Sequence, residues 1–291
     1  MKKVVILGCE NSHADSFLSI IKDHPEFSEI SVIGVYSEEE SAMQELSEKY
    51  GVYKMQALDE FSGSVDGVII TARHGAKHYE YAKPYIKKGA IFYIDKPITI
   101  TEEEGLEFMA VLKENGIKIC GGSICKHDDF VKEIKAKRES GERFLGGFAR
   151  APYQPNSVHG GYFFYGQHLV EIICEMFGRF PKSVAITKND VANTINVSFK
   201  YDNYDVLGVY VDNNYEYFGV VHTEKDIKCS KVFTTCYKEC SYREFKEYFD
   251  LIMGKTNGAD YKEFISPVFI MNAIFRAINT GKEQKINEIE I

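Results

Sequence analysis

The first 122 residues alternate between short apolar runs and longer segments with helical periodicity. The apolar runs predict strands at residues 3–8, 30–37, 65–72, 90–95 and 117–122. Helical patterns lie between them at residues 13–24, 38–51, 75–90 and 101–116. Strands that are apolar throughout and separated by helices are typical of a parallel sheet covered on both faces. The pattern therefore predicts a doubly wound α/β domain.

Helix boundaries are marked by residues with known capping preferences. Gly51, Gly89 and Gly116 each follow a helical pattern, where glycine readily adopts the left-handed conformation that ends a helix. Thr101 followed by Glu104 matches a capping box at the start of the fourth helix. These signals support the boundaries that the apolar periodicity predicts.

Beyond Cys125 the pattern becomes rich in strands. One linking helix is expected at residues 126–142, followed by helical patterns at 166–178 and 260–280. Strand-like runs lie at residues 144–151, 183–188, 194–201, 206–211, 217–223 and 227–234. Polar turns separate several of these runs, which favours neighbouring antiparallel strands. We therefore expect two domains, residues 1–123 and 124–291, the second of the α+β class.

Composition restricts the function classes. The net charge of −8 argues against a nucleic-acid surface, and no apolar run is long enough to span a membrane. Seven scattered cysteines and the absence of a secretory signal predict reduced thiols in a cytoplasmic protein. Cys229, Cys236 and Cys240 with His222 match no common zinc-ligand spacing, so no metal site is expected.

The first turn, Gly8-Cys-Glu-Asn-Ser-His, resembles a dinucleotide loop in part. Glu10 and His13 stand where the fingerprint G-x-G-x-x-G has its second and third glycines. Ser12 with Asp15 predicts a helix cap, and a helix N-terminus binds phosphate through its free N–H groups. By itself the segment fits an altered phosphate loop and a plain strand-to-helix turn equally well.

Ligands of doubly wound sheets bind beyond the carboxyl ends of the strands. Gly8, Ser37, Thr71 and Asp95 end strands there and are expected to line one crevice. Ser37 stands where an acidic residue commonly holds the adenosine ribose, and three glutamates follow it. This combination does not choose between NAD and NADP.

Asp95-Lys96-Pro97 follows a fully apolar strand. A lysine at that point can hydrogen-bond a substrate hydroxyl or relay its proton. Without further signals, the same tripeptide would be interpreted as the start of a surface loop.

Further segments match one family in the correct order. "YIDKPITIT" resembles the E-K-P motif of the glucose–fructose oxidoreductase / inositol dehydrogenase / MocA family, with Asp95 in place of glutamate. The stretch from Val65 to Pro97, the segment "GGYFFYGQHLVEIICEMFG" and the closing "AIFRAINTGKEQKI" resemble further family segments. The resemblance therefore covers nearly the whole chain.

The resemblance implies an NAD(P)-dependent oxidoreductase that transfers a hydride between nicotinamide and a hydroxyl or carbonyl of a small polar substrate. It implies a Rossmann domain followed by an α+β domain with an open, mostly antiparallel sheet, assembled as a homodimer or homotetramer. Lys96 would orient the reacting group and relay its proton, and His168 would be the general acid/base. Its position near a helix start is expected to lower its pKa. The cofactor, NAD or NADP, would contact Gly8, Asn11, Ser12, His13, Ser37, Thr71, Ala72, Arg73, His78, Asp95 and Lys96.

One position departs from the family pattern. Dehydrogenating members carry an aspartate four residues before the histidine, and Phe164 stands there in this chain. Phe164, Tyr165 and Glu171 are the candidate substrate contacts. The departure keeps a second hypothesis open, a cofactor- or metabolite-binding regulator of the same fold with little or no turnover.

Overall fold

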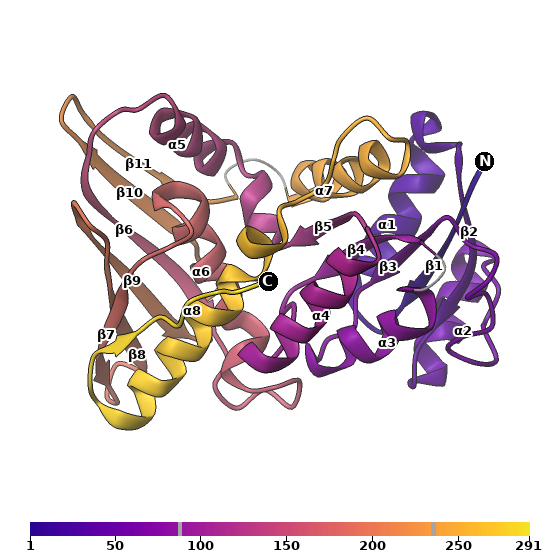
Figure 1. Ribbon diagram of the computed structural model, residues 1–291, viewed down its shortest axis with the longest axis horizontal. Helices are drawn as coiled ribbons and strands as arrows, with labels where there is room; N and C mark the ends of the chain where they lie inside the picture. Colours follow the sequence, from indigo (N-terminus) through magenta and orange to yellow (C-terminus); the bar gives the residue numbers. More distant parts are fainter. Residues whose placement is uncertain (87–88, 234–236) are drawn as a thin grey trace.

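The computed structural model describes residues 1–86, 89–233 and 237–291, so Cys236 lies outside the described residues. The described chain forms a five-stranded and a seven-stranded sheet, which lie at opposite ends of the molecule in Figure 1. Both expected architectures, the doubly wound parallel sheet and the mostly antiparallel sheet, are confirmed. The proposed division at residue 123 stays a prediction.

The first sheet is parallel throughout, with strand order β2-β1-β3-β4-β5. Its strands are β1 (Lys2–Leu7), β2 (Ile30–Tyr36), β3 (Gly67–Ile70), β4 (Ile91–Asp95) and β5 (Ile119–Gly122). Because β2 and β3 flank β1 on opposite sides, the strand order reverses at β1. A crevice at the carboxyl ends of β1 and β3 follows from this order.

Helices cover both faces of this sheet, as the continuous apolar strands require. They are α1 (Ser12–Asp23), α2 (Glu40–Tyr50), α3 (Ala76–Ile86) and α4 (Glu102–Glu114), with a 3-10 turn η1 (Pro25–Phe27) after α1. Thr101 caps α4 by accepting from the Glu104 N–H, and Gly51 ends α2 in the left-handed conformation, as predicted. The expected cap of α1 is wrong by one residue. Asn11 accepts from the His13 N–H, because the side chain just before the first helical residue is the one that reaches that donor.

A helix that the sequence interpretation missed, α7 (Tyr237–Ile252), returns from the second half of the chain to the first sheet (Figure 1). Phe245, Tyr248 and Ile252 of α7 are buried in one cluster with Val4 and Phe17. The apolar spacing of these three residues is that of one helix face. The core of the N-terminal sheet is therefore completed by residues far along the chain.

The second sheet has strand order β11-β10-β6-β9-β8-β7-β12. Its strands are β6 (Phe144–Tyr153), β7 (Ser183–Asn189), β8 (Thr194–Lys200), β9 (Asp205–Asp212), β10 (Phe218–Thr223), β11 (Ile227–Lys231) and β12 (Gln284–Lys285). All neighbouring pairs are antiparallel except β6 and β9, which are parallel. The sheet is open, because β11 and β12 form its two edges.

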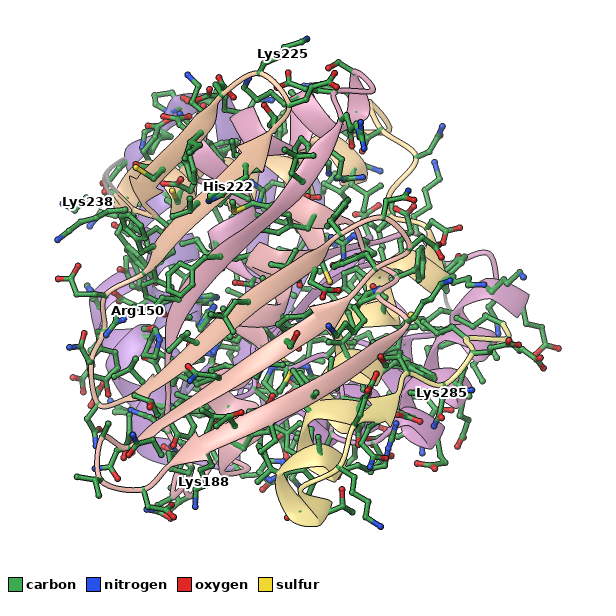
Figure 2. All side chains as sticks on the ribbon, turned by 90° about the vertical axis from the view of Figure 1, so that its left-hand side faces the viewer. Arg150, Lys188, His222, Lys225, Lys238 and Lys285 are labelled. Atoms are coloured by element: carbon green, nitrogen blue, oxygen red, sulfur yellow. The ribbon has the colours of Figure 1, made fainter. Side chains whose placement is uncertain are left out.

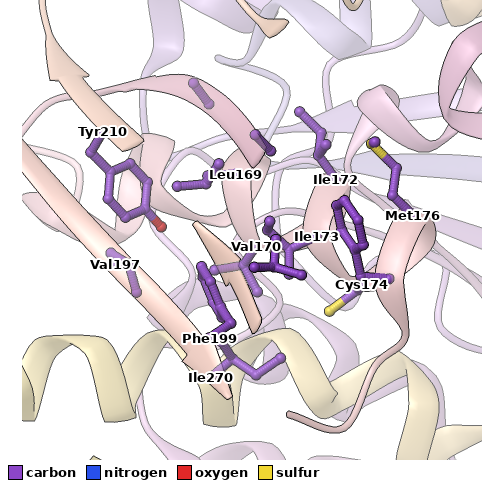
Figure 3. Close-up of a cluster of buried hydrophobic side chains, with 14 of the residues drawn as sticks. Leu169, Val170, Ile172, Ile173, Cys174, Met176, Val197, Phe199, Tyr210 and Ile270 are labelled. Atoms are coloured by element: carbon purple, nitrogen blue, oxygen red, sulfur yellow. The ribbon is translucent and has the colours of Figure 1, made fainter. Parts of the chain in front are cut away.

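One face of the second sheet packs against helices and the other remains bare. The helices are α5 (Asp129–Glu139), α6 (Tyr162–Phe177) and α8 (Tyr261–Thr280), and a short 3-10 segment η2 (Ile124–His127) precedes α5. Leu169 and Ile173 of α6 pack with Phe199 of the sheet and Ile270 of α8 in the cluster shown in Figure 3. Figure 2 looks onto the bare face, with the strands in front and the helices behind them.

No helix among the described residues has the length and apolar character that a membrane crossing needs.

Candidate active site

A cavity of about 550 Å³ lies where the carboxyl ends of β1 and β4 meet the first turns of α6. Its walls come from both halves of the chain. The lining residues are Asn11, Ser12, His13, Lys96, Ile124, Phe164, Tyr165, His168, Tyr215, Glu216, Tyr217, Lys231, Val232, Phe233 and Tyr237. The tertiary structure therefore brings together Lys96 and His168, which are 72 positions apart in the sequence.

Lys96 follows the last residue of β4 and is 5% exposed. Its Nζ lies 4.8 Å from the centre of the Phe164 ring and 5.6 Å from that of Tyr165. It forms no ion pair with any of the described residues. An ammonium group over aromatic faces is stabilised by the ring quadrupoles while its donors stay available to a ligand.

His168 lies in the second turn of α6 and is 6% exposed. Its Nδ1 is 2.7 Å from Ser123 Oγ, which itself accepts from the Cys125 N–H. Burial, followed by the positive charge of Lys96, holds the pKa of His168 well below its usual range. The low pKa that the sequence predicts is thus present, but burial rather than the helix end is its main cause. The imidazole is neutral at pH 7.

Asp95 is fully buried beside Lys96 and receives contacts from the first loop. Asn11 Nδ2 donates to Asp95 Oδ2 at 3.1 Å, and His13 Nδ1 lies 3.0 Å from the same oxygen. Burial opposes the charge of this carboxyl, but the positive charge of the nearby His13 lowers the pKa of Asp95. Burial likewise opposes the charge of His13, and the carboxylates of Asp95 and Glu244 raise the pKa of its imidazole. His13 therefore points to β4, where it pairs with Asp95.

Glu244 of α7 joins this buried pair, and the sequence interpretation missed it together with its helix. The side chain is 1% exposed, and Tyr93 Oη donates to its Oε1 at 2.7 Å. Burial raises the pKa of Glu244 to about 7. His13, Asp95 and Glu244 each offer an atom within 4.8 Å of the others, a grouping that also occurs in metal sites. Since α7 packs on α1 and β4, only the fold could reveal this neighbour.

The first loop approaches β3 closely. Gly8 has φ +77°, and a Cβ there would lie 2.3 Å from the Ala72 backbone. Thr71 Oγ1 donates to the Gly8 carbonyl at 3.0 Å, and His78 Nε2 contacts the Ala72 carbonyl at 2.8 Å. Burial lowers the pKa of His78. Thr71, Ala72 and His78 thus hold the loop in place from beneath.

Glu10 takes the place of the second fingerprint glycine and points across the crevice. Its Oε2 accepts from Ser37 Oγ at 2.8 Å, and its Oε1 accepts from the Arg73 N–H at 3.0 Å. The Arg73 guanidinium lies 3.6 Å from Glu39. Of the residues expected to contact a cofactor, Ser37 and Arg73 therefore lie around Glu10, whereas Ser12 is exposed at the cavity.

The candidate substrate contacts separate into two groups. Phe164 and Tyr165 lie in the first turn of α6, beside Lys96, because α6 begins four residues earlier than predicted. Glu171 does not reach the cavity. It is buried against Arg179 at 2.9 Å and lines a different cavity, near Gly122, about one helical turn beyond His168. Glu171 as a substrate contact stays a prediction, and its side chain lies apart from the cavity of Lys96 and His168.

The chain is similar to proteins of one oxidoreductase family. Residues 2–122 match the Gfo/Idh/MocA family, described as "Oxidoreductase family, NAD-binding Rossmann fold". The chain is 26% identical over 152 residues to the uncharacterized oxidoreductase YhhX of Escherichia coli K12. That match covers 48% of this chain and 43% of YhhX, which is less than half of each.

Solved structures agree in fold over almost the whole length. A putative myo-inositol dehydrogenase from Sinorhizobium meliloti superposes with a TM-score of 0.84 at 14% identity, over 99% of this chain and 100% of that one. A scyllo-inositol dehydrogenase from Lactobacillus casei, with bound NAD(H) and scyllo-inositol, gives 0.83 at 12% identity over 98% and 99%. Residues 2–122 therefore resemble the NAD-binding domain of the Gfo/Idh/MocA oxidoreductase family, and almost the whole chain has the fold of these solved structures.

Proposed function

We propose that the protein is an NAD(P)-dependent oxidoreductase acting on a hydroxyl or carbonyl group of a small polar substrate. The observation that carries this proposal is the cavity in which Lys96 and His168 meet the N-terminus of α1. A lysine, a neutral imidazole and a helix N-terminus at the carboxyl edge of a parallel sheet supply a proton donor, a proton acceptor and a phosphate-binding element.

The crevice has two features that suit a dinucleotide. Gly8 packs directly against Ala72 where a side chain would not fit, and Ser12 is exposed at the first turn of α1. Gly8, Ser12, Ser37 and Arg73 are the residues that would hold the cofactor. When bound, nicotinamide supplies a hydride acceptor or donor.

Lys96 would position the reacting oxygen of the substrate. Its ammonium has aromatic faces beside it and three donors that can reach a hydroxyl or carbonyl oxygen. A cation at this point also stabilises negative charge that develops on the oxygen.

His168 would accept the hydroxyl proton during oxidation and return it during reduction. With Nδ1 directed at Ser123, Nε2 is the ring nitrogen that serves the cavity. Because the ring is buried and neutral, Nε2 has a free lone pair when Nδ1–H donates to Ser123 Oγ.

A sugar, a polyol or a derivative of one suits the rest of the cavity. The rings of Tyr165 and Tyr217 flank His168, at 5.4 and 5.9 Å between ring centres, and Phe164 lies beside Lys96. Aromatic faces pack against the C–H faces of sugar rings, and Tyr215 and Tyr237 also line the cavity. Structural relatives named as inositol dehydrogenases are consistent with this class.

The bare face of the second sheet supports assembly as a homodimer or homotetramer. Leu145, Leu207 and Ile227 on its strands are 54%, 41% and 65% exposed. Large apolar side chains on an uncovered sheet face favour association with another sheet.

The test combines nucleotide binding with turnover. We expect NADH or NADPH to bind to the protein in a nicotinamide fluorescence titration. Lys96→Met and His168→Asn should retain this binding but lose turnover by about 100-fold or more on any sugar or polyol that the parent oxidises. Failure of both nucleotides to bind at millimolar concentration would overturn the proposal.

A second candidate function, a metabolite-binding regulator with little turnover, is favoured by one observation. Phe164, not a carboxylate, lies beside the Lys96 ammonium. If the parent binds NADH but oxidises no member of a broad polyol and sugar panel, this second function is favoured.

A further inference from the structure

The carboxylate of Glu10 lies at the end of β2 although Glu10 belongs to the first loop. Ser37, the first residue after β2, donates from Oγ to Glu10 Oε2 at 2.8 Å. The other oxygen accepts from the Arg73 N–H just beyond β3 at 3.0 Å. The two hydrogen bonds fix the direction of the carboxylate across the crevice.

In dinucleotide-binding folds an acidic residue at the end of the second strand commonly hydrogen-bonds the adenosine ribose. This chain has Ser37 at that position. Because the Glu10 carboxylate is within hydrogen-bond distance of the Ser37 hydroxyl, an acidic group is nevertheless present there. It comes from the loop after β1 instead of from β2.

The remaining polar side chains of the loop point elsewhere. Asn11 and His13 are directed to Asp95 at the end of β4. Glu10 alone among them reaches the β2 side, and it is only half-buried. Each of its oxygens has a further lone pair beyond the bond already made. The loop thus divides its side chains between the two halves of the crevice.

We propose that Glu10 binds the ribose diol of the adenosine half of NAD and excludes the 2′-phosphate of NADP. This inference rests on the proposed function, since it assumes that a nicotinamide dinucleotide occupies the crevice. A carboxylate accepts hydrogen bonds from two ribose hydroxyls but repels a phosphate placed at the same point. The guanidinium of Arg73 pairs with Glu39 at 3.6 Å, and among the described residues no ion pair to Glu10 is present.

The experiment measures the affinity of NADH and of NADPH by nicotinamide fluorescence for the parent, Glu10→Gln and Glu39→Gln. Glu39 is the matched control, since it is a half-exposed carboxylate in the same region that contacts Arg73. We expect the parent to prefer NADH about tenfold or more, a ratio typical of losing one hydrogen bond to a charged group. Glu10→Gln should reduce the preference to about twofold, and Glu39→Gln should retain it. Circular dichroism confirms that each variant is folded.

Glu10→Gly separates this role from a simple obstruction. If Glu10 recognises ribose, Glu10→Gly weakens NADH binding and strengthens NADPH binding. Equal tightening of both nucleotides would identify Glu10 as an obstacle and overturn the inference, as would a parent that prefers NADPH or an unchanged ratio in Glu10→Gln. These three results leave the proposed function intact, whereas a parent that binds neither nucleotide would overturn both.

Discussion

At the residue scale, the environment of His168 shows how burial keeps an imidazole in its neutral form. The ring is enclosed by α6 and contacts Ser123, and the Lys96 ammonium adds a positive charge nearby. Both effects disfavour the imidazolium form. Burial and the nearby ammonium of Lys96 thus keep the imidazole of His168 neutral.

This coupling predicts the behaviour of the Lys96→Met variant. Removing the ammonium should raise the pKa of His168 towards its usual value, while burial keeps it below that value. Histidine Cε1–H chemical shifts followed through a pH titration measure the change. Lys231→Met, which removes an exposed cation of the same cavity, is the control and should leave the His168 pKa in place. An unchanged pKa in Lys96→Met would show that burial acts alone.

At the scale of elements, α7 determines the electrostatics beneath the first loop. It supplies Glu244, whose charge contributes to raising the pKa of His13 and whose own pKa burial raises to about 7. A carboxyl whose pKa is higher in the folded state than in the unfolded chain binds more protons when folded. Its stabilising contribution is complete below about pH 4.5 and is lost as the pH rises through about 7.

Glu244→Gln should therefore flatten the dependence of stability on pH. The difference in the free energy of unfolding, parent minus variant, should decrease by about 1–3 kcal/mol as the pH rises from 4.5 to 7.5. Urea denaturation at a series of pH values measures it. Glu239→Gln, which changes an exposed carboxylate on the same helix, should show the same pH dependence of stability as the parent. The same pH dependence in Glu244→Gln would contradict this prediction.

At the scale of the whole molecule, the two halves of the chain share their cores. Phe245 of α7 is fully buried against Phe17 and Phe27 of the N-terminal half, with ring centres 5.4 and 5.0 Å apart. Phe264 and Phe269 of α8 are buried in the cluster on the other face of the same sheet. The N-terminal sheet is therefore covered by helices from the C-terminal half on both faces.

Phe245→Ala should destabilise the entire protein. We expect a loss of about 3–5 kcal/mol in the free energy of unfolding, because a large buried ring leaves a cavity among other rings. Urea unfolding followed by circular dichroism measures the loss. Phe275→Ala, at a ring 40% exposed on α8, should cost much less. Equal costs would mean that α7 is not an integral part of the first core.

Much of the fold and part of the site could be predicted without coordinates. The strands of the first sheet, the helices between them and the position of Lys96 follow from local patterns, because apolar runs and capping residues act over a few positions. The helix α7 also has a regular apolar spacing, but its packing partners Val4 and Phe17 are more than 200 positions away. No local pattern indicates which surface such a helix covers.

The sequence by itself determined the doubly wound sheet, the mostly antiparallel second sheet, the resemblance to the family and the candidates Lys96 and His168. Only the tertiary structure decided that these two share a cavity, that His13 turns to Asp95 and Glu244, and that Glu171 lies elsewhere. It also decided that the Glu10 carboxylate reaches Ser37 and Arg73. The physical reason is the same throughout: periodicity and capping are local, whereas the pairing of buried charges depends on which distant elements the fold brings into contact.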